Sequence, residues 1–220
     1  MLERILEPEV MDTVEEAQDY DQMDHTQVNR VFVDDLIDAD CPDGLLLDLG
    51  TGTAQIPVEL SKRFPGFRIL AVDLAGHMLD QANVNVEAAS LTESIMLDQV
   101  DAKELPYEDD EFDAVISNSI IHHIPEPITA LREAARVVRP DGLLFFRDLM
   151  RPIDEESLDQ LVQTYAGDEV EHAQQMFRDS LHAALTVDEM RGLVEQLGFD
   201  GGTVQATTDR HWTWIARGLA

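Results

Sequence analysis

Short apolar runs alternate with stretches of helical periodicity through the middle of this chain, and this alternation limits its possible folds more than any other feature. The apolar runs span residues 45–49, 68–72, 94–99, 112–117 and 142–147. The helical stretches span residues 54–64, 75–86 and 127–138. Repeated strand–helix–strand units form parallel sheets that helices cover on both faces, joined by right-handed crossovers. The pattern therefore predicts a doubly wound α/β sheet.

The segments on either side of this alternation are predicted to be helical. The first 40 residues have helical spacing and are expected to form an N-terminal helical cap, which the Asp-Cys-Pro-Asp-Gly sequence at residues 40–44 ends. Residues 154–183 are expected to form a helical insertion or lid. No Gly-, Ser- or Pro-rich linker divides the chain, so residues 1–220 are expected to form a single domain.

The C-terminal part is predicted to close the sheet with an antiparallel edge. Thr186 and Glu189 fit a capping box, and the helix that follows is expected to stop at Gly198. Two strands, residues 202–208 and 211–216, then form a hairpin, which gives a mainly parallel sheet of seven strands. Residues 139–142 are expected to form a turn before the fifth strand.

The charge of the chain excludes several classes of partner. Its 220 residues include 45 acidic and 15 basic side chains, a formal net charge of −30. Such a surface repels nucleic-acid backbones and anionic membranes, so neither is expected as a partner. The acidic residues are spread along the chain, which agrees either with a protein from a cell that has a high internal salt concentration or with an ordinary acidic protein.

Other features of composition point to a cytoplasmic protein without disulfides. Cys41 is the single cysteine, which excludes an intramolecular disulfide and a cysteine-built zinc site. No apolar run reaches about 18 residues, the length that a membrane-spanning helix requires. The first residues lack the basic and then apolar order of a secretory signal.

A glycine-containing loop is the sharpest chemical signal. Residues 48–54 (Asp-Leu-Gly-Thr-Gly-Thr-Ala) follow a predicted strand and begin a predicted helix, which is where a ligand-cradling loop occurs. Glycines at positions 50 and 52 permit a tight turn and a close approach of the backbone to a ligand. Twenty-five residues after Asp48, Asp73 ends the second strand, where an acid can accept both hydroxyls of a ribose.

The same edge of the sheet favours a nucleoside ligand without phosphates. Asp101 and Ala102 follow the third strand, in position to meet a nucleobase edge. A dinucleotide site would place a third glycine where this chain has Gln55, and its pyrophosphate would be repelled by Asp48 and Asp73. A nicotinamide oxidoreductase is therefore the weaker alternative.

With these motifs in order, the chain resembles the class I S-adenosylmethionine-dependent methyltransferases of the small-molecule type, which have a Rossmann-like fold. The resemblance covers roughly residues 28–217. The matching stretches are residues 45–54 (glycine loop), 71–78 (ribose acid), 101–106 (adenine loop), 112–121 (fourth strand) and 139–146 (turn into the fifth strand). A departure is Ala54, where many members carry a third glycine.

The resemblance implies a set of contacts to S-adenosyl-L-methionine. Gly50 and Gly52 would line its methionine part, in a loop that also contains Asp48 and Thr51. Asp73 would hold the ribose hydroxyls. The remaining implied contacts are Leu74 and Met78 beside the adenine, Asp101 and Ala102 at its edge, and Asn118 and Ser119 bordering the methyl group.

Catalytic and substrate contacts are predicted from the remaining polar residues at strand ends. His122 and His123 follow the fourth strand and are candidate bases, because histidine titrates near neutral pH. A structural role is the alternative, and two adjacent histidines do not have the spacing of a metal site. The candidate substrate contacts are Tyr20 and His25 from the N-terminal segment and Arg147, Asp148 and Arg151 at the end of the fifth strand. An Arg–Asp ion pair that braces the sheet edge is the alternative for the last group.

The sequence thus predicts a methyltransferase that acts on a small molecule by in-line displacement. A protein methyltransferase and a non-catalytic S-adenosylmethionine-binding protein stay open as alternatives. Neither the acceptor atom nor the oligomeric state follows from the sequence.

Overall fold

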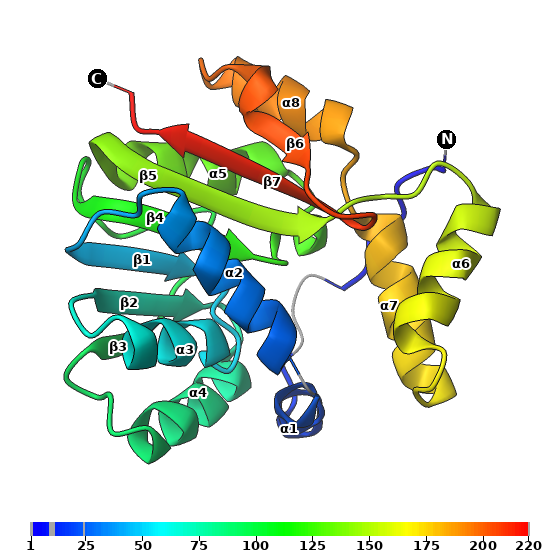
Figure 1. Ribbon diagram of the computed structural model, residues 1–220, viewed down its shortest axis with the longest axis horizontal. Helices are drawn as coiled ribbons and strands as arrows, with labels where there is room; N and C mark the ends of the chain where they lie inside the picture. The colour runs from blue at the N-terminus through cyan, green and yellow to red at the C-terminus, as the bar shows by residue number, and fades with distance from the viewer. Residues whose placement is uncertain (1, 9–11, 24, 220) are drawn as a thin grey trace. The chain divides into compact units, whose positions relative to one another are not determined.

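The computed structural model describes residues 2–8, 12–23 and 25–219, which fall into two compact units. The larger unit comprises Val10–Asn118, Thr129–Phe146 and Ile215–Ala220, and the smaller unit comprises Met1–Glu9, Ser119–Ile128 and Arg147–Trp214. A seven-stranded sheet has the order β3-β2-β1-β4-β5-β7-β6 (Figure 1). Its strands are β1 (Leu45–Leu49), β2 (Arg68–Asp73), β3 (Ile95–Gln99), β4 (Phe112–Asn118), β5 (Val138–Leu149), β6 (Val204–Ala206) and β7 (His211–Arg217). The predicted seven-stranded Rossmann-like sheet is confirmed.

The central parallel strands of the larger unit, β1 and β4, are buried on both faces. β1 pairs in parallel with β2 and β4, and β2 pairs in parallel with β3. Four consecutive residues are buried in β1 and again in β4. Since successive side chains of a strand point to opposite faces, consecutive burial means that both faces are covered. This is the arrangement that the apolar runs predict.

Five helices accompany these strands: α1 (Val14–Gln22), α2 (Thr26–Asp38), α3 (Gln55–Arg63), α4 (Gly76–Ala88) and α5 (Pro127–Val137). The ring of Phe32 on α2 meets that of Phe145 on β5 edge to face, with 5.1 Å between their centroids. Both rings belong to a core that also includes Leu46, Leu60 and Ile69. α1 starts with a capping box of Thr13 and Glu16.

The smaller unit contains three further helices and the predicted hairpin. α6 (Glu155–Ala166) and α7 (Glu171–Ala183) lie side by side (Figure 1). The capping box of Thr186 and Glu189 begins α8 (Val187–Gln196), as predicted. β6 and β7 pair antiparallel, with Val204 opposite Trp214. A 3-10 turn, η1 (Ile121–His123), follows β4, and a second, η2 (Gly201–Thr203), precedes β6.

Two predicted boundaries differ from the structure. Residues 139–142 lie inside β5 instead of forming a turn before it, because their backbone stays hydrogen-bonded: the N–H of Asp141 donates to the carbonyl of Gly218 (3.0 Å) and the N–H of Gly218 to that of Gly142 (2.8 Å). Asp141 has φ of 62°, which marks the local irregularity. β6 spans Val204–Ala206 and not the predicted residues 202–208; it begins at Val204 because the preceding residues form η2.

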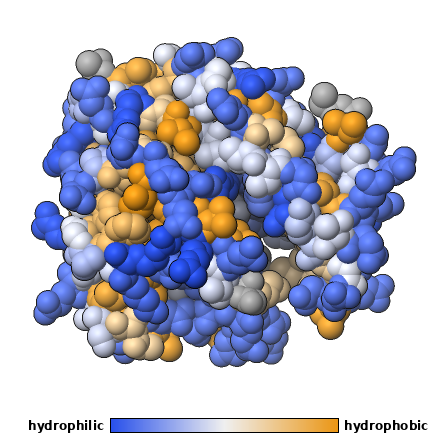
Figure 2. Space-filling model, in the orientation of Figure 1, coloured by the Kyte–Doolittle hydropathy of each residue, from blue (hydrophilic) through white to orange (hydrophobic). Residues whose placement is uncertain are grey.

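The surface in view agrees with the acidic composition. Figure 2 shows hydrophilic residues over most of the visible face, with apolar residues in separate patches. Among the described residues, no helix has the length and apolar character needed to cross a bilayer. The single-domain arrangement, with residues 1–40 as a cap and residues 154–183 as a lid, stays a prediction.

The Phe32–Phe145 contact allows a test of this core. Replacing Phe145 with Ala should lower the free energy of unfolding by about 3–5 kcal/mol, because a fully buried ring is removed and the cavity collapses only in part. Urea denaturation measures the loss. Val84→Ala, at a side chain that is 55% exposed on α4, is the control and should change the free energy by less than about 0.5 kcal/mol. Equal effects of the two substitutions would contradict the described packing.

Candidate active site

The glycine loop between β1 and α3 folds back on the end of β2. The N–H groups of Gly50 and Thr51 both donate to the carbonyl of Val72, each at 2.9 Å. Gly50 and Gly52 have φ of 70° and 55°, in the left-handed region that glycine enters without steric cost. Ala54 also has a positive φ, 59°. This backbone conformation explains why a third glycine suits the position, and alanine there costs about 1–2 kcal/mol.

Asp73 positions this loop while keeping the capacity to bind a ligand. Its Oδ2 accepts the N–H of Gly52 at 2.8 Å, and its Oδ1 accepts the N–H of Ala75 at 2.9 Å. A carboxylate offers about four lone-pair sites, so each oxygen can accept a further hydrogen bond. The two oxygens therefore can receive two neighbouring hydroxyls, as a ribose presents them.

Asp48 and Asp73 are two neighbouring carboxylates without a countercharge, of which Asp48 is buried and Asp73 is half-buried. Asp48 is 3% exposed, and burial raises the pKa of its carboxyl to about 7, with the charge of Asp73 adding to the rise. Burial also raises the pKa of Asp73, although the N–H groups of Ala75 and Gly52 oppose the rise. No lysine or arginine among the described residues pairs with either carboxylate. Because uncompensated buried charge is costly, this pair favours a cationic ligand.

Tyr20 on α1 lies over the glycine loop. A methyl group added at Gly52 would lie 3.6 Å from Cε1 of Tyr20, so the ring contacts the loop closely. Burial raises the pKa of Tyr20 to about 12, and the charges of Asp73, Asp48 and Asp21 raise it further. The ring of His25 lies 4.8 Å from that of Tyr20. Of the two predicted substrate contacts from the N-terminal segment, Tyr20 thus lies beside the loop and His25 lies beside Tyr20. Tyr20 also packs on a small cluster that contains Met78.

A network around Asp21 holds α1 in this place, and sequence reasoning missed it. Oδ1 of Asp21 accepts the side-chain amides of Gln55 (3.1 Å) and Asn85 (2.7 Å), and its Oδ2 accepts that of Gln81 (3.0 Å). Burial opposes ionisation, but these hydrogen bonds hold the pKa of Asp21 below its usual value. α1 is therefore tied to α3 and α4 through one side chain. The only sequence signal was Gln55 itself, next to the loop.

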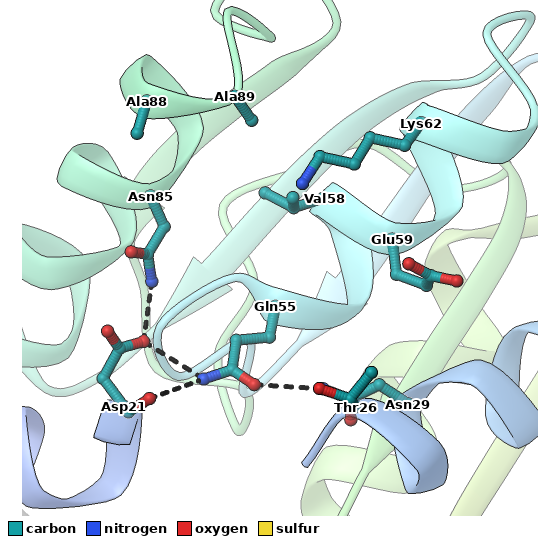
Figure 3. A pocket seen from close by; sticks show the side chains of 10 residues that line it. All are labelled: Asp21, Thr26, Asn29, Gln55, Val58, Glu59, Lys62, Asn85, Ala88 and Ala89. Carbon is teal, nitrogen blue, oxygen red and sulfur yellow. Dashed lines mark hydrogen bonds between the residues drawn. The ribbon is translucent and has the colours of Figure 1, made fainter. Parts of the chain in front are cut away.

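Asp21 also lines a polar cavity of about 410 Å³ between the helices (Figure 3). The other lining residues are Thr26, Asn29, Gln55, Val58, Glu59, Lys62, Asn85, Ala88 and Ala89. None of them is a predicted cofactor contact. The cavity and the glycine loop are thus separate, but the Asp21 network borders both, because Asn85 lines the cavity and also donates to the carbonyl of Thr53 in the loop.

The predicted adenine contacts are near the ends of β2 and β3. Oδ1 of Asp101 accepts the N–H of Lys103 at 2.9 Å and lies 3.0 Å from its ammonium nitrogen. Its side chain is 38% exposed, so a base edge would compete with Lys103 and water for this carboxylate. Leu74 accepts a hydrogen bond from the Gln99 side chain through its carbonyl. Asn118 is the last residue of β4.

In the smaller unit, His122 and Asp148 form a buried pair. Nδ1 of His122 lies 2.5 Å from Oδ1 of Asp148, whose Oδ2 accepts the N–H groups of Ile121 (2.6 Å) and His122 (3.2 Å). Burial alone would lower the pKa of His122, but Asp148 raises it above its usual value. The reverse holds for Asp148: burial opposes its ionisation, and the His122 interaction keeps its pKa low. Burial, followed by the His122 charge, lowers the pKa of His123 to about 4.

The other predicted residues of this unit also have partners within the protein. Nε of Arg147 donates to Oγ1 of Thr213 at 3.0 Å. Arg151 donates to the carbonyl of Ala184 at 2.9 Å and pairs with Glu189 at 2.5 Å. Both arginine residues are buried, with at most 6% of their surface exposed. Ser119, which has φ of 62°, donates its N–H to the carbonyl of Arg147. The structure thus gathers the predicted cofactor contacts 48–102 and Tyr20 in the larger unit, and the histidines with Asp148 in the smaller one.

Comparison with known proteins places this geometry in a family. Residues 47–146 match the family model described as a methyltransferase domain. The chain is 33% identical over 107 residues to the demethylmenaquinone methyltransferase of Lactobacillus johnsonii, covering 48% of this chain and 44% of that protein. It is 31% identical over 154 residues to the malonyl-[acyl-carrier protein] O-methyltransferase of Geobacter sulfurreducens, covering 70% and 55%. The chain thus spans about half the length of these curated relatives.

A solved structure shows the same fold over the whole chain. A putative S-adenosyl-L-methionine-dependent methyltransferase from Methanococcus maripaludis superposes with a TM-score of 0.72, covering 98% of each chain at 18% identity. At this identity the likeness concerns the fold alone. The family match, the relatives and the order of the sheet together show that residues 47–146 of this chain belong to a methyltransferase domain of the class I S-adenosylmethionine-dependent family.

Proposed function

We propose that this protein transfers a methyl group from S-adenosyl-L-methionine to a small-molecule acceptor by in-line displacement. The observation that carries the proposal is the pair of buried Asp48 and half-buried Asp73 beside a glycine loop, which has no countercharge among the described residues. Ligands of open α/β sheets bind at the carboxyl ends of the strands, and β1 and β2 end here. A cationic nucleoside without phosphates satisfies both the charge and the place.

Each part of the loop has a defined task toward this cofactor. The cofactor supplies a methyl group on a positively charged sulfur. Asp73 accepts the ribose hydroxyls through the lone pairs that Gly52 and Ala75 leave free. Gly50 and Gly52 bring the backbone close to the methionine part, and Asp48 contributes negative charge there. Tyr20 contacts the loop at Gly52.

Methyl transfer mainly requires that the acceptor atom be held in line with the methyl group and sulfur. A base is needed only for some acceptors. We propose His122 and His123 as the candidates, with Tyr20, His25, Arg147, Asp148 and Arg151 as acceptor contacts. His123 is the more accessible of the two, because 22% of its side chain is exposed against 3% for His122.

A small-molecule acceptor is supported by the relatives and by the charge. The Lactobacillus relative is named for demethylmenaquinone, a small molecule. The Geobacter relative is named for an acyl group on a carrier protein. If the acceptor of this chain is attached to a protein, we therefore expect a small group on a carrier protein. A nucleic-acid acceptor is opposed by the net charge of −30.

Removing the Asp73 carboxylate should weaken cofactor binding. Asp73→Ala is expected to raise the dissociation constant of S-adenosylhomocysteine by about 5- to 150-fold, the equivalent of 1–3 kcal/mol for charge-assisted hydrogen bonds. Titration calorimetry measures it. Asp80→Ala removes the same charge from an 83%-exposed side chain on α4 and should bind normally. Binding of NAD in place of S-adenosylhomocysteine would overturn the assignment.

Enzymatic transfer can be tested without knowing the acceptor. Incubating the protein with a metabolite extract and methyl-labelled S-adenosylmethionine should produce a labelled small molecule, and Asp73→Ala should reduce its formation. Label found on protein instead would identify a macromolecular acceptor. Cofactor binding with no labelled product in any extract would favour a non-catalytic binding protein.

The raised pKa of Asp48 predicts how stability depends on pH without cofactor. Between the ordinary carboxyl pKa of about 4 and the folded value of about 7, the unfolded state has lost the proton that the folded state keeps, so stability decreases as pH rises. Asp48→Asn should therefore equal wild type near pH 4 and exceed it by roughly 2–4 kcal/mol above pH 7. Urea denaturation across this range measures the difference. A difference that does not vary with pH would show that Asp48 does not carry this shifted pKa.

A further inference from the structure

Three potential ligand atoms from separate segments converge in the smaller unit. Oε1 of Glu7 lies 3.4 Å from Nε2 of His122 and 3.3 Å from Nδ1 of His123. All three atoms lie within 4.8 Å of one another. The side chains are 13%, 3% and 22% exposed, so the cluster is shielded from solvent. Glu7 is far from the histidines in sequence, which is why their adjacent spacing alone indicated no metal site.

Two of these atoms are buried without a hydrogen-bond partner. They are Oε1 of Glu7 and Nδ1 of His123. The other oxygen of Glu7 accepts the hydroxyl of Ser180 at 3.3 Å, so only Oε1 faces the imidazoles. A buried acceptor that is left unsatisfied is costly, and native structures contain few of them. An atom that accepts electron pairs from all three groups would remove this cost.

Asp148 orients His122 in the way that metal-binding histidines are oriented. Its Oδ1 lies 2.5 Å from Nδ1 of His122, so the Nδ1 proton points to Asp148 and the opposite nitrogen, Nε2, faces Glu7. Histidine ligands usually donate their second ring N–H to a carboxylate, which fixes the tautomer and makes the metal-facing nitrogen more basic. Asp148 is itself held by the N–H groups of Ile121 and His122.

The spacing and type of the ligand atoms indicate the class of metal. Bonds of about 2.0–2.1 Å in tetrahedral geometry separate ligand atoms by about 3.3–3.4 Å, and the two distances from Glu7 Oε1 are 3.3 and 3.4 Å. Magnesium and calcium prefer oxygen ligands, whereas two imidazoles and a carboxylate suit zinc and its first-row neighbours.

The segment that carries Glu7 is fastened to the histidine turn. Arg4 donates to the carbonyls of His122 (3.1 Å) and Ile124 (3.0 Å) and, from its Nε, to that of Ala183 (2.7 Å). The N–H of Ile5 donates to the carbonyl of His182 at 3.2 Å. The guanidinium of Arg4 opposes a cation, but the carboxylates of Glu7 and Asp148 outnumber it.

We infer that Glu7, His122 and His123 bind one divalent transition-metal ion of the zinc type, with Asp148 positioning His122 and a fourth coordination position left open. The inference concerns metal binding and does not need the methyltransferase assignment. With the metal bound, Nε2 of His122 and Nδ1 of His123 donate to it and are not available as bases. A hydrogen-bonded Glu–His–His cluster without metal is the competing interpretation.

The experiment is a zinc titration of chelator-stripped protein. Because the chain carries a net charge of −30, the buffer should contain molar KCl and excess magnesium to occupy exposed carboxylates. Calorimetry is expected to show one tight site per chain. Glu7→Gln keeps the size of the side chain and should weaken zinc binding by at least about 10- to 100-fold, as should Asp148→Asn. His77→Ala, at an exposed histidine beside Asp80 on α4, should bind zinc as wild type does.

A second readout separates this site from weak surface binding. Cobalt(II) in a tetrahedral site absorbs visible light far more strongly than hydrated cobalt, so wild type should acquire this absorption and Glu7→Gln should lose it. Circular dichroism confirms that each variant is folded. His123→Ala should also lose the cobalt absorption, and if this variant does not fold, the isosteric Glu7→Gln provides the test. Several weak sites in wild type, or a tight site that survives Glu7→Gln, would overturn the inference.

Discussion

The pair of buried Asp48 and half-buried Asp73 is the constraint on which the proposed ligand site depends. A carboxylate loses most of its hydration when it is buried, and here the second carboxylate adds repulsion in place of relief. The fold tolerates the pair because Gly52 and Ala75 donate backbone N–H groups to Asp73, which ties the glycine loop to the end of β2. The contacts that shape the loop are therefore the same contacts that keep an anionic surface ready for a cation.

Local patterns predicted the sheet and this loop because the relevant interactions are short in sequence. Buried strands require apolar runs, a left-handed turn requires glycine at 50 and 52, and a parallel sheet brings strand ends together without further information. The start of the helix after Thr186 could also be predicted, because its capping box joins two residues only three positions apart, Thr186 and Glu189. The extension of β5 back to Val138 could not be predicted, because it depends on pairing with Gly218, at the far end of the chain.

The parts of the site that escaped prediction are long-range polar contacts. Asp21 joins α1 to Gln55 and Asn85, and Glu7 meets the histidine turn; neither contact leaves a periodic trace in the sequence. Asp101 was predicted as an adenine contact from its place after β3. Its contact with Lys103 could not be predicted, because it depends on side-chain conformation, which strand patterns do not encode. The sequence thus predicts which strand ends lie together at one edge of the sheet. The structure adds which polar side chains contact one another there.

The acidic composition gives both candidate sites a common character. The arginines that form ion pairs lie mostly at the surface, as in Arg63 with Asp34 and Arg139 with Asp113, so they do not neutralise the buried carboxylates. At about 1 M salt, exposed charges more than about 3 Å apart are largely screened, but buried groups are screened much less. In concentrated salt the general attraction of this surface for cations therefore fades, while the Asp48–Asp73 pair and the Glu7 cluster keep theirs. Selectivity for a cation then comes from buried geometry and not from net charge.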